Sequence, residues 1–238
     1  AAVLNAHIYD QSTSNPSISV VVDLGFSHTE VSVYQTGSGL YFPKSTTIIK
    51  TMCGNVLVKS LAEHCSKDFM RKAKFPCSDN KKAMIKLTLA CEEAMKSLST
   101  GTEAMIDIDS LCEGVDYSTK ISKARFEDLG SIPFIHLKKC FNETLEKCGI
   151  DNSSVTNVVI AGGLSGMPKC QNLLSSAFPT AILKKTRGLE QSEACAVGCS
   201  LQGKQLFLTG LLDKVPETTA RVNSVCMNSS VSLQMTTD

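Results

Sequence analysis

The chain has 238 residues, of which 42% are hydrophobic and 20% are charged, and its formal net charge is +1 at pH 7. This size and composition suit one large domain or two small ones with a sizeable core. The near-neutral charge and the absence of Trp argue against a nucleic-acid interface, and no apolar run reaches the roughly 18 residues that span a bilayer. We therefore expect neither nucleic acid nor a membrane as a direct partner.

The first third of the chain predicts a β-meander. The β-branched run that ends at Asp23 is typical of a buried strand, and a turn follows at Gly25. The connection Gly37-Ser38-Gly39 is typical of a hairpin. In order, we expect the end of a helix at 1–8, a loop at 10–16 and strands at 17–23, 29–34 and 40–49.

The middle of the chain predicts two helices, a strand pair and a short helix. Asp79 or Asn80 can cap the second helix, whose apolar residues recur at steps of three and four. Ser122 can start the short helix, which ends near Gly130. The expected helices are 54–70 and 81–99, and the expected strands are 103–109 and 116–121.

The last third begins with a helix that we expect Ser131 to cap, with Pro133 in its first turn and a stop at Gly149. A buried strand at 155–161 leads into Gly162-Gly163 and a helix that carries Pro168. A helix rich in small residues is expected at 191–203. Residues 206–238 are expected to be a linker that starts another region, or a disordered tail.

Eleven cysteines are many for this length, and no C-x-x-C pair occurs among them. Their spacing gives no support to a zinc site, so we expect free thiols in a reducing, cytoplasmic compartment. Most of them fall on apolar faces, where Cys behaves as a small hydrophobe. The cysteines expected on such faces are Cys53, Cys65, Cys91, Cys140, Cys148, Cys170, Cys195 and Cys199.

Three places in the chain have the chemistry to hold a nucleotide. At Asp23-Leu24-Gly25, the glycine lets backbone N–H groups approach a phosphate, and the carboxylate can hold magnesium through water. Ala161-Gly162-Gly163 joins a strand to a helix, a layout that suits anions, although it is neither a Walker loop nor G-x-G-x-x-G. Glu92, Lys96 and Ser99 share one helical face. Taken alone, the first two also fit ordinary turns, and the third fits a surface ion pair.

The order of residues from Asp109-Ser110-Leu111-Cys112-Glu113-Gly114 to Phe126-Glu127, with further matches at 86–92, 96–99 and 158–169, resembles the seventy-kilodalton heat-shock protein (Hsp70, DnaK-type chaperone) family. The resemblance extends almost ungapped to about Gly203. It implies an α/β, actin-like ATPase fold, of which this chain is similar to the second lobe only. Residues 1–52 and 131–205 would form the inner subdomain, and 53–130 the outer subdomain.

The resemblance also implies cofactors, partners and site residues. ATP or ADP and Mg²⁺ would be the cofactors. A J-domain co-chaperone, a nucleotide-exchange factor, unfolded or nascent polypeptides and the ribosome would be partners. Asp23 falls on the family's magnesium- and water-positioning aspartate, and Glu30 falls on a second catalytic aspartate of the same loop. The positions that match nucleotide-binding residues are Gly25, Gly54, Glu92, Lys96, Ser99, Gly162 and Gly163.

The chain departs from the family pattern at the expected site. Phe26 and Ser27 carry side chains where the family has glycines, and His28 replaces a threonine. Met95 replaces a basic residue of the helix face, and Gly166 replaces an arginine that stacks on adenine. Losing a cation or stacking partner commonly costs about 1 to 2 kcal/mol, so several such losses weaken ATP binding.

Two hypotheses follow from the match and its departures. The first is a divergent ATP-binding chaperone whose hydrolysis needs a first lobe; the second is a non-hydrolysing scaffold that keeps the fold for co-chaperone contacts. A sugar-kinase half is a third reading, which the segment 109–127 disfavours. The stretches at 84–88 and 97–100 resemble an atypical cytosolic member of the family.

Overall fold

The computed structural model describes residues 16–37, 40–184 and 194–208. The predictions for 1–15, for the tip of the hairpin at 38–39 and for the tail beyond 208 lie outside the described residues. The described strands form two sheets, a five-stranded sheet and a two-stranded hairpin. The large sheet contains β1 (Ser17–Leu24), β2 (Thr29–Gly37), β3 (Leu40–Ile49), β6 (Val155–Ala161) and β7 (Ile182–Lys184), in the order β3-β2-β1-β6-β7.

The predicted meander is confirmed. β1 pairs antiparallel with β2, and β2 pairs antiparallel with β3. β1 also pairs in parallel with β6, so the carboxyl ends of these two strands meet at one edge of the sheet. β7 is only three residues long and was not predicted from the sequence.

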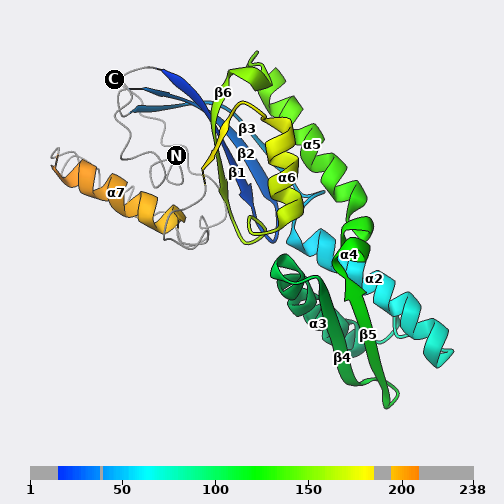
Figure 1. Cartoon of the computed structure of the whole chain (residues 1–238). Coiled ribbons are helices and arrows are strands. Elements are labelled where there is room, and N and C mark those ends of the chain that lie inside the picture. Colours follow the sequence, from blue (N-terminus) through cyan, green and yellow to red (C-terminus); the bar gives the residue numbers. More distant parts are fainter. Residues whose placement is uncertain (1–15, 38–39, 185–193, 209–238) are drawn as a thin grey trace.

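One face of the large sheet is covered by α5 (Ser131–Glu146) and α6 (Pro168–Ala177), as Figure 1 shows. β1 turns Val20, Val22 and Leu24 into this core, because side chains alternate along a strand. Val21 lies on the opposite face, in a small cluster with Val159. The alternation of β1 therefore places Asp23 on the face away from α5 and α6.

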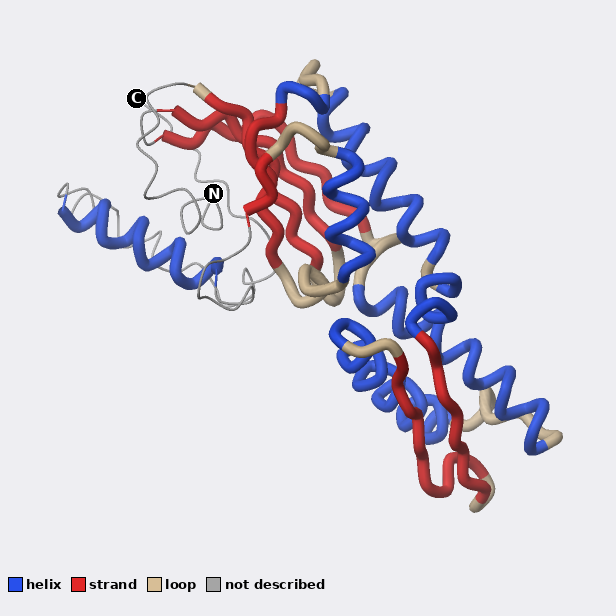
Figure 2. Tube along the Cα trace, in the orientation of Figure 1, coloured by secondary structure: helices blue, strands red, loops and turns tan. Residues whose placement is uncertain are grey.

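The outer part, which we name by its predicted bounds 53–130, is inserted between β3 and α5. Figure 2 shows its hairpin standing apart from the large sheet. α3 packs against α2 and covers the face of the hairpin that carries Ile106. The outer part contains α2 (Gly54–Ala73), α3 (Lys81–Thr100), β4 (Glu103–Cys112), β5 (Val115–Ser122) and α4 (Lys123–Leu129).

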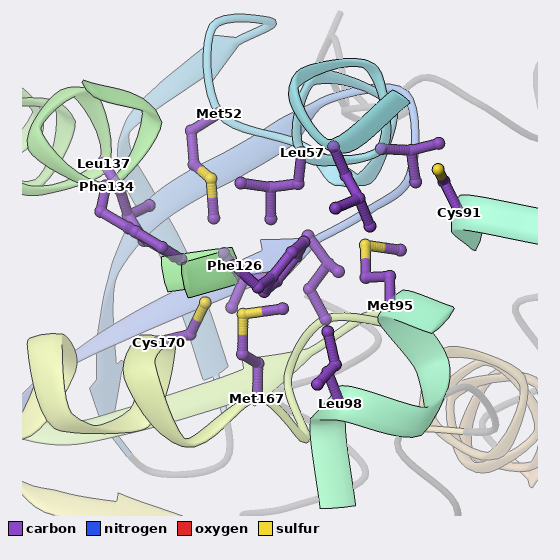
Figure 3. Close-up of a cluster of buried hydrophobic side chains, with 14 of the residues drawn as sticks. Met52, Leu57, Cys91, Met95, Leu98, Phe126, Phe134, Leu137, Met167 and Cys170 are labelled. Atoms are coloured by element: carbon purple, nitrogen blue, oxygen red, sulfur yellow. The ribbon is translucent and has the colours of Figure 1, made fainter. Parts of the chain in front are cut away.

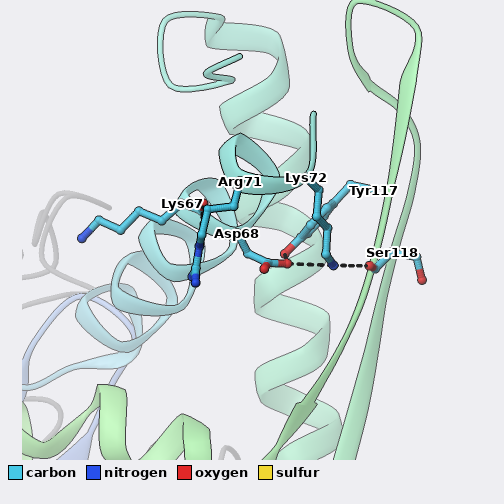
Figure 4. Close-up of polar contacts among 6 residues, drawn as sticks. All are labelled: Lys67, Asp68, Arg71, Lys72, Tyr117 and Ser118. Carbon is cyan, nitrogen blue, oxygen red and sulfur yellow. Dashed lines mark hydrogen bonds and ion pairs between the residues drawn. The ribbon is translucent and has the colours of Figure 1, made fainter. Parts of the chain in front are cut away.

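Polar contacts join the end of α2 to β5 (Figure 4). Tyr117 donates its hydroxyl hydrogen to Asp68 Oδ2 at 3.1 Å, and Lys72 Nζ lies 2.8 Å from the same oxygen. Lys72 also donates to the Ser118 carbonyl at 3.1 Å. Partial burial raises the pKa of Asp68, but the hydrogen bonds from Lys72 and Tyr117 outweigh it, so the pKa lies below its ordinary value. The ion pair is therefore built into the junction of helix and hairpin.

Two predicted helix caps are confirmed and one is wrong. Asn80 Oδ1 accepts hydrogen bonds from the N–H groups of residues 82 and 83, and Ser122 Oγ accepts one from residue 125. Ser131 is not a cap but the first residue of α5, and the cap position is Gly130. Gly130 also ends α4 by donating to the Phe126 carbonyl. Because α4 runs directly into α5, no extended residue is left between them to carry a capping side chain.

The buried hydrophobic side chains of the large sheet and of the outer part belong to one continuous cluster, part of which is drawn in Figure 3. Several of the cysteines contribute to it as predicted, and all cysteines in the described residues are free. The prediction was wrong for Cys195 and Cys199 of α7 (Ala194–Leu208), which are exposed. The cysteines buried as predicted are Cys53, Cys65, Cys91, Cys140 and Cys170, and Cys148 is partly buried.

Candidate functional site

The carboxyl ends of β1 and β6 bring two of the predicted places together. Asp23 lies opposite Ala161 in the parallel register, so the loops that follow the two strands are neighbours. Gly162 has φ +86°, and a Cβ there would lie 2.5 Å from both Asp23 Oδ1 and the Leu24 carbonyl oxygen. Only glycine fits a position with that backbone and that space. The structure therefore places Asp23 directly against the backbone of Gly162.

Asp23 and Glu30 lie opposite each other in the antiparallel register of β1 and β2, so their side chains share one face of the sheet. The surrounding protein and the charge of Glu30 raise the pKa of Asp23, and His28 opposes that rise. The Asp23 side chain is exposed to solvent. Glu30 Oε1 accepts a hydrogen bond from Ser32 Oγ at 2.8 Å. Two neighbouring carboxylates of this kind fit a hydrated Mg²⁺, which binds few protein ligands directly.

No group of three or more His, Cys, Asp or Glu side chains suited to a metal ion occurs among residues 16–37, 40–184 and 194–208. Any Mg²⁺ at Asp23 and Glu30 would therefore depend on water and on a ligand phosphate for its remaining contacts. That Asp23 acts on magnesium through water, as the resemblance implies, stays a prediction.

The loop after β1 is fastened to the first turn of α2. The Gly25 N–H donates to the His28 carbonyl at 3.1 Å, which closes the loop on itself. The Gly54 and Asn55 N–H groups donate to the carbonyls of Gly25 and Phe26, at 3.1 and 2.8 Å. These are amides of the helix start that have no partner within the helix. Because the loop satisfies them, neither is directed at a phosphate.

Phe26 covers Gly54, the residue predicted to lie near the terminal phosphate. A Cβ at Gly54 would lie 2.7 Å from Phe26 Cδ2, so the aromatic ring rests on the glycine backbone. The ring is still 46% exposed. Thr29 does not replace the missing threonine of the loop, because its buried hydroxyl donates to the Met52 carbonyl at 2.7 Å. The loop therefore presents an aromatic ring where the family pattern has bare backbone.

Glu92, Lys96 and Ser99 lie together on α3 as predicted. Lys96 Nζ is 3.3 Å from Glu92 Oε1 and 2.8 Å from Glu93 Oε1, and both carboxylates raise the pKa of Lys96. Ser99 Oγ donates to the Lys96 carbonyl at 2.6 Å. Glu93 was not among the predicted site residues, although its three-residue spacing from Lys96 was the available signal. The ammonium group predicted to contact a nucleotide is thus shared between two carboxylates.

Met95 and Gly166, two of the departures from the family pattern, behave differently in the structure. Met95 is only 5% exposed and packs into the core instead of facing a ligand. A Cβ at Gly166 would meet no atom within 4 Å, so this position opens onto free space. The loop around it is braced, because Ser165 Oγ bonds to the Gly162 carbonyl and Gln171 Nε2 donates to the Ser165 carbonyl.

The three predicted places come from both parts of the chain. Asp23 lies on β1, and Gly25 and Gly162 lie in the loops that follow β1 and β6 of the large sheet, whereas Lys96 lies on α3 of the outer part. Figure 3 shows the second half of α3 facing the loop that carries Met167, a few residues after Gly162. A ligand that touched all three places would therefore bridge the inner and outer parts.

Comparison with known proteins identifies the family. A family model described as Hsp70 protein matches residues 1–216. A heat shock protein of the SSB type from Pyricularia oryzae is 34% identical over 183 residues, which cover 77% of this chain and 30% of that protein. A ribosome-associated molecular chaperone of the SSB type from Saccharomyces cerevisiae is 33% identical over 191 residues, which cover 80% of this chain and 30% of that protein.

Heat shock 70-related protein 5 of Dictyostelium discoideum is 33% identical over 210 residues, which cover 85% of this chain and 41% of that protein. The chain thus spans about a third of the length of the relatives that it matches. Within the described part of the chain, no helix combines the length and the apolar character needed to cross a bilayer. The chain belongs to the Hsp70 family, and its α/β structure is that of the actin-like ATPase domain of this family.

Proposed function

We propose that this chain is the second lobe of a divergent ATP-binding chaperone, which acts in the cytoplasm on unfolded or nascent polypeptides. The observation that supports nucleotide binding is the meeting of β1 and β6, where Gly162 leaves no room for a Cβ beside Asp23. Such backbone closeness at the carboxyl ends of parallel strands suits a phosphate ligand. MgATP or MgADP would be held between this lobe and a first lobe.

Each site residue has a role in this proposal. Asp23 would accept hydrogen bonds from the waters of Mg²⁺ and orient the attacking water, with Glu30 adding negative charge beside it. Because the Gly25 amide already bonds to His28, phosphate contact would fall to the following amides of the loop. Gly162 and Gly163 would approach the adenosine, and Glu92, Lys96 and Ser99 would contact it from α3. Bound ATP supplies the phosphoryl group that hydrolysis transfers to water.

A pair of neighbouring glycines provides the test. Gly162→Ala places a Cβ 2.5 Å from Asp23 Oδ1, whereas a Cβ at Gly163 meets nothing within 4 Å. In the protein that contains both lobes, we expect Gly162→Ala to weaken MgATP binding at least about tenfold in calorimetric titrations, because it displaces Asp23. Gly163→Ala should bind like the wild type. Equal affinities for the three proteins, or no binding by the wild type, would refute the proposal.

This lobe alone is not expected to turn over ATP, because a nucleotide held from one side lacks the groups that a first lobe supplies. A phosphate-release assay on the 238-residue chain checks this point. Turnover well above the rate without protein would contradict it.

A non-hydrolysing scaffold is the second candidate, and Phe26 favours it. The ring rests on Gly54, where a terminal phosphate would need open backbone. In this case the fold would serve to bind co-chaperones, namely a J-domain protein and a nucleotide-exchange factor. If Phe26 and Ser27 obstruct the loop, replacing both with glycine should strengthen ATP binding in the two-lobe protein. Unchanged affinity would remove the obstruction argument.

Within the family, we propose a likeness to the atypical cytosolic member called heat shock 70 kDa protein 14, on the matches at 84–88 and 97–100. That likeness implies work with a J-domain partner on nascent chains at the ribosome. The names of the yeast relatives as ribosome-associated chaperones agree with this proposal. Co-sedimentation of the two-lobe protein with translating ribosomes tests it, and recovery only in the ribosome-free fraction would contradict it.

A further inference from the structure

The outer part is joined to the inner part at the start of α2, where the Gly54 and Asn55 amides donate to the Gly25 and Phe26 carbonyls, and by side chains farther along the junction. The backbone crosses between them twice, at Cys53 and at Gly130. A polar contact across the junction, Lys169 Nζ to Glu127 Oε2, is 3.7 Å long and partly exposed. Exposed ion pairs of this kind contribute little, typically about 0 to 1 kcal/mol. Hydrophobic packing must therefore supply most of the free energy that holds α3 against the inner part.

Four buried side chains of the continuous core lie where α3, α4 and the loop before α6 meet, and we call them the apolar seam: Met95 and Leu98 of α3, Phe126 of α4, and Met167 just before α6. Their exposed fractions are 5%, 2%, 2% and 4%, and all four belong to the continuous core. Figure 3 shows Phe126 near the centre, with Met167 beside it from the inner part and Leu98 and Met95 of α3 on its other side. The apolar seam thus crosses the junction of the two parts.

Met95 is the member of the apolar seam that the family pattern does not predict. The resemblance places a basic residue at this position, and an ammonium group would have to leave the core to stay solvated. The thioether of Met is flexible and apolar, so it can fill the space beside Phe126. Replacing a cation by Met95 therefore removes a ligand contact and adds a buried apolar side chain to the seam.

We propose that the apolar seam holds the outer part closed on the inner part without a bound nucleotide. Swinging the outer part away would bring Met95, Leu98 and Met167 into water, which opposes opening whether or not a ligand bridges Gly162 and Lys96. The inference does not rest on nucleotide binding, because no seam residue is among the predicted phosphate or adenosine contacts. It assigns to side-chain packing the bridging role that a ligand would otherwise have.

Two native cysteines report on opening. Cys170 lies beside the apolar seam and is completely buried, and burial raises the pKa of its thiol to about 12. Cys140 is equally buried on α5 within the inner part. Opening at the junction exposes Cys170 and leaves Cys140 covered, whereas global unfolding exposes both. Labelling by N-ethylmaleimide, followed for each cysteine by peptide mass spectrometry, separates these events.

We expect Cys170 of the intact, nucleotide-free protein to resist labelling as strongly as Cys140. In Met95→Lys, Cys170 should be labelled about tenfold faster than in the wild type, because a buried apolar side chain is lost from the junction. The labelling rate of Cys140 should not change. Met105→Lys is the matched control, since Met105 is exposed on the hairpin and should leave both rates unchanged. If Met95→Lys fails to fold, Met95→Ala serves in its place. It adds no charge and should accelerate the labelling of Cys170 in the same way.

Three results would overturn the proposal. One is rapid labelling of Cys170 in the nucleotide-free wild type. Another is a wild-type rate at Cys170 in both Met95 variants. The third is a parallel acceleration of Cys140 and Cys170 in Met95→Ala, which would show that Met95 supports the whole fold and not the junction.

Discussion

Lys96 shows how neighbours decide what a residue can do. Its position on α3 matches a nucleotide contact, yet its ammonium lies between two carboxylates. Phe26 and Gly54 make the same point, because their contact joins residues that are 28 positions apart. The residue types at the site could be predicted from the sequence, but the neighbouring side chains that contact them in the fold could not.

Asp23 gives a pH-dependent prediction. The surrounding protein and the charge of Glu30 raise its folded-state pKa, so ionising it costs more in the folded chain than in the unfolded chain. Stability of the wild type should therefore fall relative to Asp23→Asn as the pH rises above the unfolded pKa of about 3.9. Urea unfolding followed by circular dichroism should show Asp23→Asn as the more stable protein at pH 7.

The advantage of Asp23→Asn should shrink as the pH is lowered toward 4, since the wild-type carboxyl then gains its proton in both states. Asp107→Asn, which removes one carboxyl at an exposed position on β4, is the control for the loss of a single charge. A stability difference independent of pH would contradict the assigned cause.

Gly166 allows a lost contact to be restored. A side chain there meets no neighbour within 4 Å at its Cβ, so Gly166→Arg should leave stability unchanged. If adenine binds beside this loop, a stacked guanidinium should strengthen MgATP binding about tenfold, in line with about 1 to 2 kcal/mol for a cation on an aromatic ring. Gly166→Gln extends the chain without a charge and should gain much less in calorimetric titrations. An equal gain for the two variants would argue against stacking.

At the scale of elements, the strands and helices follow the hydrophobic pattern closely, and the failures have local causes. β7 is too short for an alternating pattern to show, and it forms because β6 offers a free parallel edge. The cap assigned to Ser131 failed because Gly130 serves both α4 and α5. Cys195 and Cys199 are exposed in α7, whose small residues carried no clear signal for one face.

The two caps make a matched pair of substitutions. Asn80→Ala removes the oxygen that accepts two N–H groups of α3, and should destabilise the protein by about 1 kcal/mol in urea unfolding. Ser131→Ala removes no capping bond, and should change stability by less than about 0.5 kcal/mol. A loss at Ser131 as large as that at Asn80 would show that the side chain of Ser131 has a role that its position at the start of α5 does not explain.

At the scale of the whole molecule, the two sheets are physically separate but share their core. The buried cluster runs from Val20 of β1 to Ile106 of β4 without interruption. The outer and inner subdomains were predicted from the family resemblance alone, since no composition shift marks residues 53 or 130. This core joins residues that are far apart in the sequence, so no local hydrophobic pattern predicted it.

The shared core predicts that inner and outer parts unfold together. Hydrogen exchange along a urea titration should give one midpoint for β6 and for β4, because unfolding of either part removes packing from the core that the other part shares. Partial opening at the junction, measured by cysteine labelling, is compatible with this result, since the core of each part stays packed. Two separate midpoints would mean that the parts are independent folding units.

Because the Gly25–Phe26 loop is hydrogen-bonded to the start of α2, a movement of the loop tilts the whole helix. α2 has 20 residues, so it is about 30 Å long, and its far end carries the Asp68–Lys72–Tyr117 contacts to the hairpin. A tilt of about 5° at the loop would displace that far end by roughly 2.6 Å over this length. The hairpin can therefore register a movement of the loop that is itself too small to break any of the hydrogen bonds involved.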